Sequence, residues 1–559
     1  MARVLILGGG FSGVFTAKNL AKSAPSGTEV VLVSETNYFT FQPLLPEVAA
    51  GALSASDSVT QLRQLLKGQN VKVVQAEVLN VDFTAKTVTV TQGSKRRIKD
   101  MSYDQLVVAM GQVVRLDRVP GLAEHSFPVK TTAHAHRLRN HVINCLEYAD
   151  GLEDTEVRKR ILTFVVIGAG FSGVETIGEV KDMIDRSLKF YPNISKGEVH
   201  MVLVEFAGRI LGELPESLAK YAEKRLQKQG IEIWLNTGVK AASFFNVEMN
   251  DGRVIDSSTI VATIGNGASP LVEAMNVEKE RGKIKTDEFM RVAGPDGVWA
   301  VGDVALIPMK DKNGNDTFAP PTAQFAVREG SQLANNITAS LKGVALKPFH
   351  YVPQGSMASI GNYRAVADVM GLRMSGVLAW LMWRAFYLGM LPGMVTKIRV
   401  VIDWLMDLFA ARNLGQISEL KTGSAKFMRF TKGQTVFEPG MTANGFYTIV
   451  EGSFSISIES AKGGETFQRV LKKGDHFGER VLFRPDKRMH TGRVEALEDA
   501  VVLRLEKQDF WNLAHSMPML ENYFRDYIKE KFPEDLQPED LQAPDLQAPD
   551  LQAKKTDPS

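Results

Sequence analysis

Two stretches of this sequence share one pattern: a short apolar run, a glycine-rich turn and a helical segment. Residues 3–7 (RVLIL) suit a buried parallel strand, and the turn GGGFSG at 8–13 follows directly. Residues 163–167 (TFVVI) precede the turn GAGFSG at 168–173 in the same way. Two strand–turn–helix units of this kind predict two nucleotide-binding lobes in one α/β protein.

Each glycine of such a turn has a physical role that other residues cannot fill. The first makes the tight turn, the second lets a diphosphate approach the backbone, and the third lets helix and strand pack closely. The N-terminus of the following helix then offers free N–H groups and a partial positive charge. One such turn is weak evidence, but two in the same context predict a protein that binds two dinucleotides.

An acidic residue ends the next predicted strand in both units. Glu35 follows the apolar run 30–33, and Glu205 follows 201–204. A carboxylate at this place can accept hydrogen bonds from ribose hydroxyls. Glu205 favours NAD over NADP, because it would repel a 2′-phosphate; Arg209 nearby weakens that preference without reversing it.

A third element, VWAVGD at 298–303, is a predicted strand that ends in Gly302 and Asp303. An aspartate in this position can hold the ribityl chain of a flavin.

Composition limits the remaining possibilities. A chain of 559 residues should hold three or four domains, and 44% hydrophobic with 23% charged residues is ordinary for a globular protein. The formal charge of +2 gives no reason to expect a nucleic-acid partner. A single cysteine, Cys145, excludes an intramolecular disulfide scaffold and a paired-cysteine relay. No signal sequence follows Met1, so export is not expected. The histidine spacing suggests no metal site.

These motifs carry a resemblance to a known family. The patterns GGGFSG, IGAGFSGVE and WAVGD resemble the two-dinucleotide-binding flavoproteins, and further stretches resemble type II NADH dehydrogenases, the non-proton-pumping NADH:quinone oxidoreductases. The resemblance covers residues 3–415. The further stretches are NYFTFQPLLPE at 37–47, LVEFAGRIL at 203–211, PPTAQFA at 320–326 and GSMASIG at 355–361.

The resemblance implies FAD on the first turn, NADH on the second and a quinone as acceptor, with hydride passing from NADH to the flavin. It also implies attachment to the cytoplasmic side of a bacterial inner membrane as a peripheral protein, and a homodimer. The implied FAD-binding residues are Gly8, Gly10, Phe11, Ser12, Gly13, Glu35, Gln42, Gly111, Gly302, Asp303 and Gln324. The implied NAD-binding residues are Gly168, Gly170, Phe171, Gly173, Glu175, Glu205 and Gly265.

Two residues are candidates for catalysis. Glu175 lies in the first turn of the second glycine-turn helix, where the family's matching acid handles NADH and quinone; alternatively it only complements the helix dipole. Gln324 belongs to the family's quinone motif, A-Q-x-A-x-Q-Q. That motif is only half present, because Arg328 and Glu329 replace its later glutamines. These replacements leave open a non-quinone acceptor.

Two apolar segments follow the nucleotide-binding lobes. Residues 395–411 form a predicted amphipathic helix, and 377–391 are apolar apart from Arg384. The apolar segment is too short to span a bilayer, so an anchor lying in the membrane interface fits better. Trp380, Trp383 and Tyr387 are expected at headgroup level. An ordinary core or dimer-interface helix pair is the alternative.

Residues 427–512 resemble a cyclic-nucleotide-binding domain, which implies a small β-roll. FGE at 477–479 matches the start of the phosphate-binding cassette, and this implies that Gly478, Glu479 and Arg488 bind cAMP or cGMP. The stretch after Arg488 is two residues too long, so Arg493 is a rival, and a purely structural or dimerisation module is the alternative.

The predicted fold is therefore α/β, with two Rossmann-like dinucleotide-binding domains, amphipathic membrane-anchoring helices and a C-terminal β-roll. A redox- or cyclic-nucleotide-sensing protein without turnover is the competing interpretation. The predicted segments are 1–115 and 266–348 for the FAD-binding domain, 116–265 for the NAD-binding domain, 349–415 for the anchor, 425–532 for the β-roll and 533–559 for a disordered repeat tail.

Overall fold

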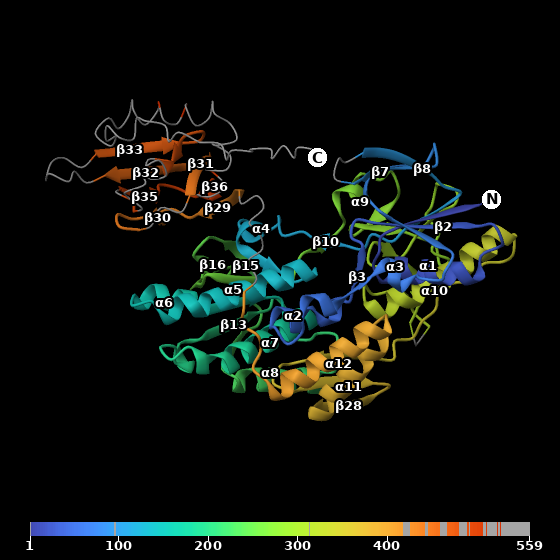
Figure 1. Cartoon of the computed structure of the whole chain (residues 1–559), viewed down its shortest axis with the longest axis horizontal. Helices are drawn as coiled ribbons and strands as arrows, with labels where there is room; N and C mark the ends of the chain where they lie inside the picture. Colours follow the sequence, from blue (N-terminus) through green and yellow to red (C-terminus); the bar gives the residue numbers. More distant parts are fainter. Residues whose placement is uncertain are drawn as a thin grey trace, which may run out of the picture. The chain divides into compact units, whose positions relative to one another are not determined.

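The computed structural model divides the chain into two compact units, Met1–Ile417 and Ser418–Ser559 (Figure 1). The predicted repeat tail and most of residues 507–532 lie outside the described residues. The structure describes residues 2–93, 97–311, 314–416, 425–441, 445–458, 467–479, 489–490, 492–506, 510, 523 and 526.

A five-stranded parallel sheet organises the first lobe, with strand order β22-β9-β1-β2-β5. Its inner strands are almost continuously apolar because helices and loops cover both faces of the sheet. Helices α1 and α10 pack together closely, since a Cβ at Gly330 would lie 2.5 Å from the Ser12 carbonyl oxygen. The elements are β1 Arg3–Leu7, β2 Glu29–Ser34, β5 Val71–Gln75, β9 Gln105–Val108, β22 Val298–Ala300, α1 Phe11–Ser23 and α10 Ala323–Lys342.

A second five-stranded parallel sheet, in the order β11-β18-β12-β13-β14, organises the second lobe. The two parallel sheets thus confirm the predicted α/β fold with two Rossmann-like lobes. The elements are β11 Ser126–Pro128, β12 Thr163–Ile167, β13 His200–Val204, β14 Ile231–Trp234, β18 Thr259–Ala262, α5 Thr132–Asp150, α7 Phe171–Ser187 and α8 Glu216–Lys228.

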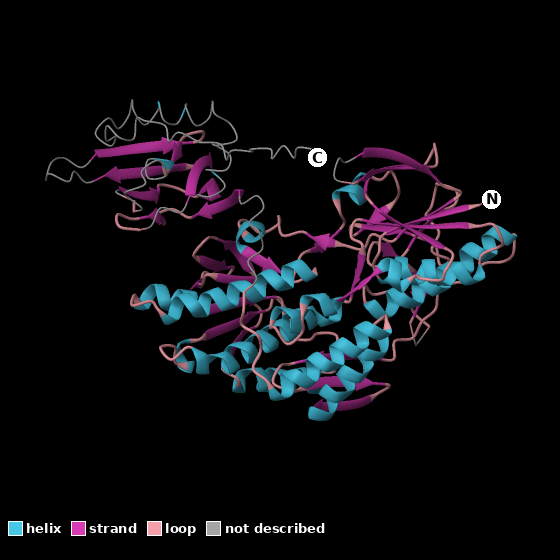
Figure 2. Cartoon of the chain, in the orientation of Figure 1, coloured by secondary structure: helices cyan, strands magenta, loops and turns pink. Residues whose placement is uncertain are grey.

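Smaller elements surround the two parallel sheets (Figure 2). Among the described residues of this unit, three antiparallel sheets have three strands each: β6 Glu77–Asp82, β7 Thr87–Gln92 and β8 Arg97–Ser102; β15 Val239–Ala242, β16 Asn246–Met249 and β17 Val254–Asp256; and β26 Gly355–Ser359, β27 Ala365–Val369 and β28 Leu372–Gly376. The short helices are α2 Leu45–Ala49, α3 Leu62–Leu65, α4 Leu122–His125, α6 Thr155–Ile161 and α9 Pro270–Ala274. The short strands are β3 Tyr38–Thr40, β4 Val59–Gln61, β10 Val113–Val114, β19 Asn266–Gly267, β20 Lys279–Glu280, β21 Lys283–Lys285, β23 Ala305–Leu306, β24 Pro308–Lys310 and β25 Asp316–Phe318.

Two helices, α11 (Val377–Met390) and α12 (Met394–Phe409), complete this unit. Their bounds agree with the helical segments expected from the sequence. The predicted headgroup position of the tryptophans is wrong, because Trp380 and Trp383 are buried in the protein. Tyr387 is partly buried and packs against Trp383. Trp383 can be buried because its indole N–H finds a carboxylate partner inside the protein, and Trp380 packs against Tyr363 and the Arg384 guanidinium.

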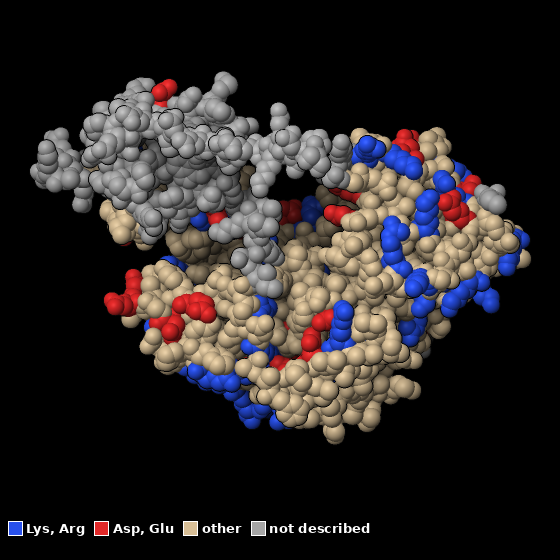
Figure 3. Space-filling model, in the orientation of Figure 1, with Lys and Arg blue, Asp and Glu red and all other residues tan. Residues whose placement is uncertain are grey.

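The apolar stripe of α12 faces away from the core. Ile398 and Ile402 are half exposed and Phe409 is 86% exposed, whereas Asp407 on the opposite side is buried. On α11, Leu378 and Leu381 are also exposed. Figure 3 shows a surface largely free of charge over α11, α12 and β28. A helix pair with its apolar side outward is the reverse of a normal amphipathic packing and marks an interaction surface.

Buried ion pairs attach this helix pair to the rest of the unit. Arg384 on α11 contacts Glu47 on α2 at 3.3 Å, and its guanidinium lies over the rings of Trp380 and Trp404. Arg412, just after α12, pairs with Asp407 at 2.9 Å and Asp182 at 2.8 Å. Each cation is buried with a carboxylate partner, as a buried charge requires.

The second unit contains two four-stranded sheets, in the orders β29-β36-β31-β34 and β30-β35-β32-β33. Their aromatic residues form its core, where the Phe477 ring lies 5.6 Å from Phe454 and 5.8 Å from Phe437. The expected β-rich domain is confirmed. The strands are β29 Ala425–Phe430, β30 Thr435–Phe437, β31 Gly445–Glu451, β32 Ser453–Ile458, β33 Phe467–Lys472, β34 His476–Phe477, β35 Gly492–Ala496 and β36 Ala500–Glu506.

Candidate active site

The first glycine turn joins β1 to α1 and leaves no room for side chains at two of its glycines. Gly8 has φ +117°, and a Cβ at Gly13 would lie 2.0 Å from the Gly8 carbonyl oxygen. A Cβ at Gly10 would instead meet open space. Within the described part of the chain, no side chain caps the N-terminus of α1. The free N–H groups and the open face at Gly10 therefore fit the diphosphate of a dinucleotide.

The first turn opens onto a cavity of about 290 Å³. Lys130 also lines it and forms an ion pair of 3.8 Å with Asp303. Phe11 packs against Phe39, with 4.8 Å between the ring centroids, and thereby fixes the start of α1. Sequence-predicted residues that line this cavity are Gly8, Gly10, Phe11, Ser12, Gln42, Gly111 and Asp303.

Four of the predicted FAD-binding residues, Gly13, Glu35, Gly302 and Gln324, lie outside that lining. Gly302 has φ +80°, and a Cβ there would lie 2.5 Å from the Ser12 Oγ, so this glycine sets the approach of the β22 loop to α1. Glu35 is exposed and borders a separate cavity of about 880 Å³, although its neighbours Ser34 and Thr36 line the first one.

The second glycine turn joins β12 to α7 and repeats the geometry. Gly168 has φ +96°, and a Cβ at Gly173 would lie 1.8 Å from the Gly168 carbonyl oxygen. The Gly170 position is open. Gly265 has φ +81° and packs against the Arg115 backbone. It does not line the cavity at the second turn, so the backbone turn explains why a glycine stands at this position.

The Glu205 carboxylate forms a hydrogen bond with the backbone of the second turn. One carboxylate oxygen accepts the Ala169 N–H at 2.6 Å, and the other accepts the Ala207 N–H at 2.8 Å. The charge-assisted hydrogen bond from Ala169 fixes the end of β13 to the glycine turn, and the one from Ala207 orders the loop that follows β13.

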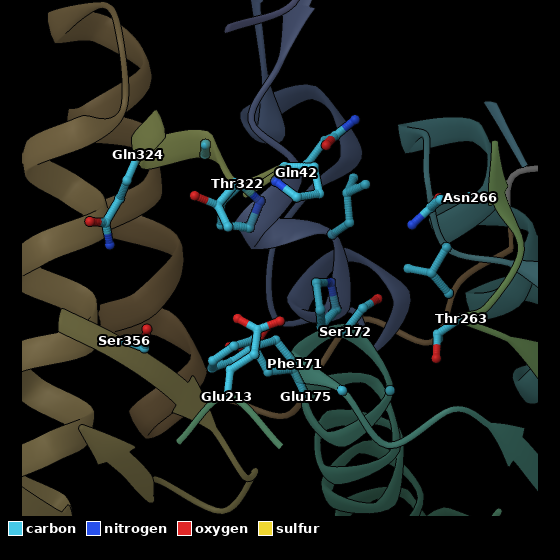
Figure 4. A pocket seen from close by; sticks show the side chains of 18 of the residues that line it. Gln42, Phe171, Ser172, Glu175, Glu213, Thr263, Asn266, Thr322, Gln324 and Ser356 are labelled. Carbon is cyan, nitrogen blue, oxygen red and sulfur yellow. The ribbon is translucent and has the colours of Figure 1, made fainter. Parts of the chain in front are cut away.

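A second cavity, of about 540 Å³, lies at the second turn and adjoins the first. Figure 4 shows side chains around its opening, with the polar residues Gln42, Thr322 and Gln324 on one side and Phe171, Glu175 and Glu213 on the other. Gly170 and Gly173 also line it. Four residues line both cavities: Gln42, Lys130, Pro321 and Ala323.

Glu175 is the buried acid of the second cavity. Its Oε1 accepts the Ser359 backbone N–H and the Trp383 indole N–H, both at 3.0 Å. Burial raises the pKa of Glu175 to about 8, against the lowering effect of these two donors. The carboxyl group is therefore mostly protonated at neutral pH and can give up a proton inside the cavity.

Gln324 lines the same cavity from the start of α10. Its Nε2 donates to the Gly355 carbonyl at 3.1 Å, and its Oε1 accepts from the Tyr351 hydroxyl at 3.2 Å. One amide hydrogen remains for another acceptor.

The two charged residues that replace the motif glutamines do not line this cavity. Arg328 is exposed and lies 5.3 Å from the Tyr351 ring centroid. Glu329 is buried and accepts the Gly302 N–H at 2.8 Å, and burial raises its pKa to about 7. Neither residue lines the first or the second cavity.

Sequence reasoning missed several residues of this site. Lys130, Glu213 and Tyr387 line the second cavity without belonging to any recognised motif. Ser359 and Trp383 contact Glu175 although they lie 184 and 208 residues away from it along the chain. Only the GSMASIG stretch could have indicated Ser359.

In the second unit, Gly478 has φ +93° and lies against the Gly445 carbonyl, and Glu479 is buried. Arg488 lies outside the described residues. The rival Arg493 is exposed and pairs with Glu495 at 2.9 Å. That pair neutralises its charge.

Comparison with known proteins agrees with this geometry. Residues 2–330 match the pyridine nucleotide-disulphide oxidoreductase family, residues 354–413 the NDH2 C-terminal domain, and residues 427–516 the cyclic nucleotide-binding domain. The fold and the paired glycine-turn cavities thus define a two-dinucleotide-binding oxidoreductase of the pyridine nucleotide-disulphide class.

Curated relatives specify the family further. The type II NADH:quinone oxidoreductase NdhA of Mycobacterium tuberculosis is 32% identical over 436 residues, which cover 74% of this chain and 89% of the relative. The Staphylococcus aureus type II NADH:quinone oxidoreductase is 31% identical over 385 residues, covering 68% of this chain and 92% of the relative. The chain belongs to the type II NADH:quinone oxidoreductase family.

Solved structures agree on the fold. NDH2 from Plasmodium falciparum, in complex with RYL-552, matches with a TM-score of 0.68 at 20% identity. The match covers 74% of this chain and 100% of the NDH2 chain. Sulfide:quinone oxidoreductase from Aquifex aeolicus has a TM-score of 0.57 at 20% identity, covering 73% of this chain and 95% of its own.

Proposed function

We propose that the protein oxidises NADH and reduces a quinone, with FAD in the first cavity and the nicotinamide of NADH in the second. The observation that carries this proposal is that the two cavities adjoin and share four lining residues. Each cavity begins at a glycine turn with an uncapped helix N-terminus among the described residues. Two dinucleotides bound at these turns would meet where the cavities adjoin.

The chain's own residues would hold the two dinucleotides in different ways. At the first turn, backbone N–H groups near Gly10 would bind the FAD diphosphate, and Asp303, which lines the same cavity, would bind the sugar-derived chain. At the second turn, Gly170 gives the NADH diphosphate access to α7. Glu205 would accept from a ribose hydroxyl with the lone pairs that Ala169 and Ala207 leave free.

The reaction takes up one proton: NADH, H⁺ and quinone become NAD⁺ and quinol. Bound FAD supplies the two-electron carrier between the nicotinamide and the quinone. We assign Glu175 as the acid that gives a proton to the quinone oxygen, since it is buried, lines the cavity and has a pKa of about 8. Gln324 would orient a quinone carbonyl through its remaining amide hydrogen.

Quinones dissolve in lipid, so we place the protein on a membrane surface through α11 and α12. The outward apolar side of these helices supports this placement. In the part of the chain that the structure describes, helices fall short of the length and apolar character needed to cross a bilayer. A peripheral position on the cytoplasmic side of a bacterial inner membrane gives access to both NADH and quinone. The homodimer stays a prediction.

Steady-state turnover tests this function. Oxidation of NADH by the purified, flavin-containing protein should require an added quinone and should run much faster with NADH than with NADPH, because Glu205 disfavours a 2′-phosphate. Equal rates with and without quinone under anaerobic conditions would contradict the proposed acceptor.

For the second unit we propose that Gly478, Glu479 and Arg488 bind a cyclic nucleotide. The match to the cyclic nucleotide-binding domain supports this assignment. Isothermal titration of the full chain with cAMP and with cGMP tests it, and Glu479→Gln is the matched variant. Saturable heat that the variant lacks supports binding, whereas no heat with either ligand contradicts it.

A further inference from the structure

The Glu175 carboxyl group is held from two separate parts of the fold, and both contacts go to the same oxygen. The Ser359 N–H and the Trp383 Nε1–H each donate to Oε1 at 3.0 Å. These two hydrogen bonds therefore leave the second oxygen, Oε2, for the cavity that Glu175 lines. An acid used for proton transfer needs such a fixed orientation.

A close approach of two backbones brings Ser359 to Glu175. A Cβ at Gly178 on α7 would lie 2.7 Å from the Ile360 carbonyl carbon. Gly361 has φ +71°, and a Cβ there would lie 2.3 Å from the Gly178 carbonyl oxygen. The end of β26 can therefore lie directly on α7, and this contact is set by backbone rather than by side chains.

The Trp383 contact has a different origin, because it comes from the membrane-facing helix α11. Trp383 is 1% exposed, and its ring lies 4.8 Å from that of Tyr387, which lines the second cavity. On the same helix, Leu378 and Leu381 are 71% and 52% exposed. One helix thus carries both the outward apolar side and a hydrogen-bond donor to the buried acid.

We infer that Trp383 is a positioning residue for quinone reduction: its indole N–H orients the Glu175 carboxyl group toward the cavity and makes that orientation depend on the position of α11. The inference rests on the proposed function, since it assigns the proton donor's partner. Trp383 acts only through Glu175.

The groups that face Glu175 would be unchanged by a substitution at Trp383. Glu179 lies one turn later on α7, Glu47 comes from α2, and Tyr387 comes from α11. Glu213 lines the cavity opposite. The burial that raises the pKa of Glu175 remains, whereas one of the two donors that lower it is lost.

Trp383→Phe tests this inference, because phenylalanine keeps most of the ring and removes the N–H. The matched control is Trp404→Phe: Trp404 is also buried, and its Nε1 donates at 2.8 Å to Glu47 rather than to Glu175. The measurement is the rate of flavin reoxidation by a water-soluble quinone against pH, after reduction with NADH.

In wild-type protein the rate should fall as the pH rises through about 8, where Glu175 loses its proton. In Trp383→Phe the midpoint should move upward by about one pH unit, a tenfold change in proton affinity. Flavin reduction by NADH should stay within about twofold of wild type. Trp404→Phe should move the midpoint much less, because Trp404 reaches Glu175 only through the charge of Glu47.

A Trp383→Phe midpoint equal to that of wild type, or equal shifts in both variants, overturns the inference. Absence of quinone-dependent reoxidation in wild-type protein overturns the proposed function instead. A second measurement needs no substitution: the wild-type midpoint with and without phosphatidylglycerol vesicles. A changed midpoint supports the link through α11, and an unchanged midpoint contradicts it.

Discussion

The two glycine-turn sites have the same backbone geometry but different acids. At the first turn, Glu35 is exposed and lines a separate cavity. Backbone groups and small side chains therefore form the surface of this turn. At the second turn, Glu205 binds the turn's own Ala169 N–H, and the buried Glu175 lines the cavity. The same turn thus suits a bound cofactor in one lobe and an exchanging, reacting substrate in the other.

The sharpest test of this comparison is a methyl group at the third glycine of each turn. Gly13→Ala would place its Cβ 2.0 Å from Gly8 O, and Gly173→Ala 1.8 Å from Gly168 O. Overpacking against backbone costs about 1–3 kcal/mol or more. We expect Gly13→Ala to purify without flavin and without activity. Gly173→Ala should keep its flavin and bind NADH ~10–100-fold more weakly.

Flavin absorbance and NADH titration measure these two outcomes. Gly151→Ala is the control, because a Cβ there meets no atom within 4 Å. If Gly173→Ala also lost its flavin while Gly151→Ala kept it, the two turns would not have separate ligands.

The next largest effect should come from Glu175→Gln, which keeps the shape of the side chain but cannot donate a proton as an acid. Quinone reduction should slow by about 10²–10⁴-fold, while flavin reduction by NADH changes little. The decline of the wild-type rate above about pH 8 should disappear. Separate measurement of the two half-reactions distinguishes this result from a general loss of structure, which would slow both.

The proposed membrane contact can be tested on the outward side of α12. Ile402→Asp together with Phe409→Asp should weaken binding to phosphatidylglycerol vesicles by ~10–100-fold, because two apolar side chains can no longer enter the interface. Ile98→Asp is the matched control, since Ile98 is 71% exposed on β8. Vesicle flotation measures binding, and equal weakening by the control would contradict a specific surface.

The smallest effect should come from Glu205→Gln. The variant loses the charge that strengthens two backbone hydrogen bonds, one from Ala169 in the second turn and one from Ala207 after β13, a loss of about 1–1.5 kcal/mol. The KM for NADH should rise by up to ~10-fold and discrimination against NADPH should weaken. Glu35→Gln should leave both quantities unchanged, and a matching effect there would contradict the difference between the two turns.

Local patterns predicted much of the site. The strand–glycine–helix units indicated both lobes, and Glu175 was found because it lies two residues after the last glycine of the second turn. The periodicity also predicted α12. It could not tell which side of α12 faces the core, because a helical period is the same whichever side is buried.

Long-range contacts were not predictable. In the sequence, Trp380 and Trp383 beside an apolar run fitted a membrane interface as well as a protein core. Only the fold shows that Trp383 contacts Glu175. Arg328 and Glu329 were linked to the acceptor by motif position, yet Glu329 binds the Gly302 N–H away from the second cavity. These contacts join segments distant in sequence and leave no local pattern.

In the proposed reaction, electrons pass from NADH in one cavity to quinone through a flavin in the adjoining one. Anaerobic sequential-mixing stopped flow tests it directly: the protein is mixed with one equivalent of NADH, then with a water-soluble quinone, while flavin absorbance is followed. We predict bleaching in the first step and full recovery in the second, with one quinol formed per NADH. A flavin that stays oxidised with NADH, or that stays reduced with quinone, would contradict the account.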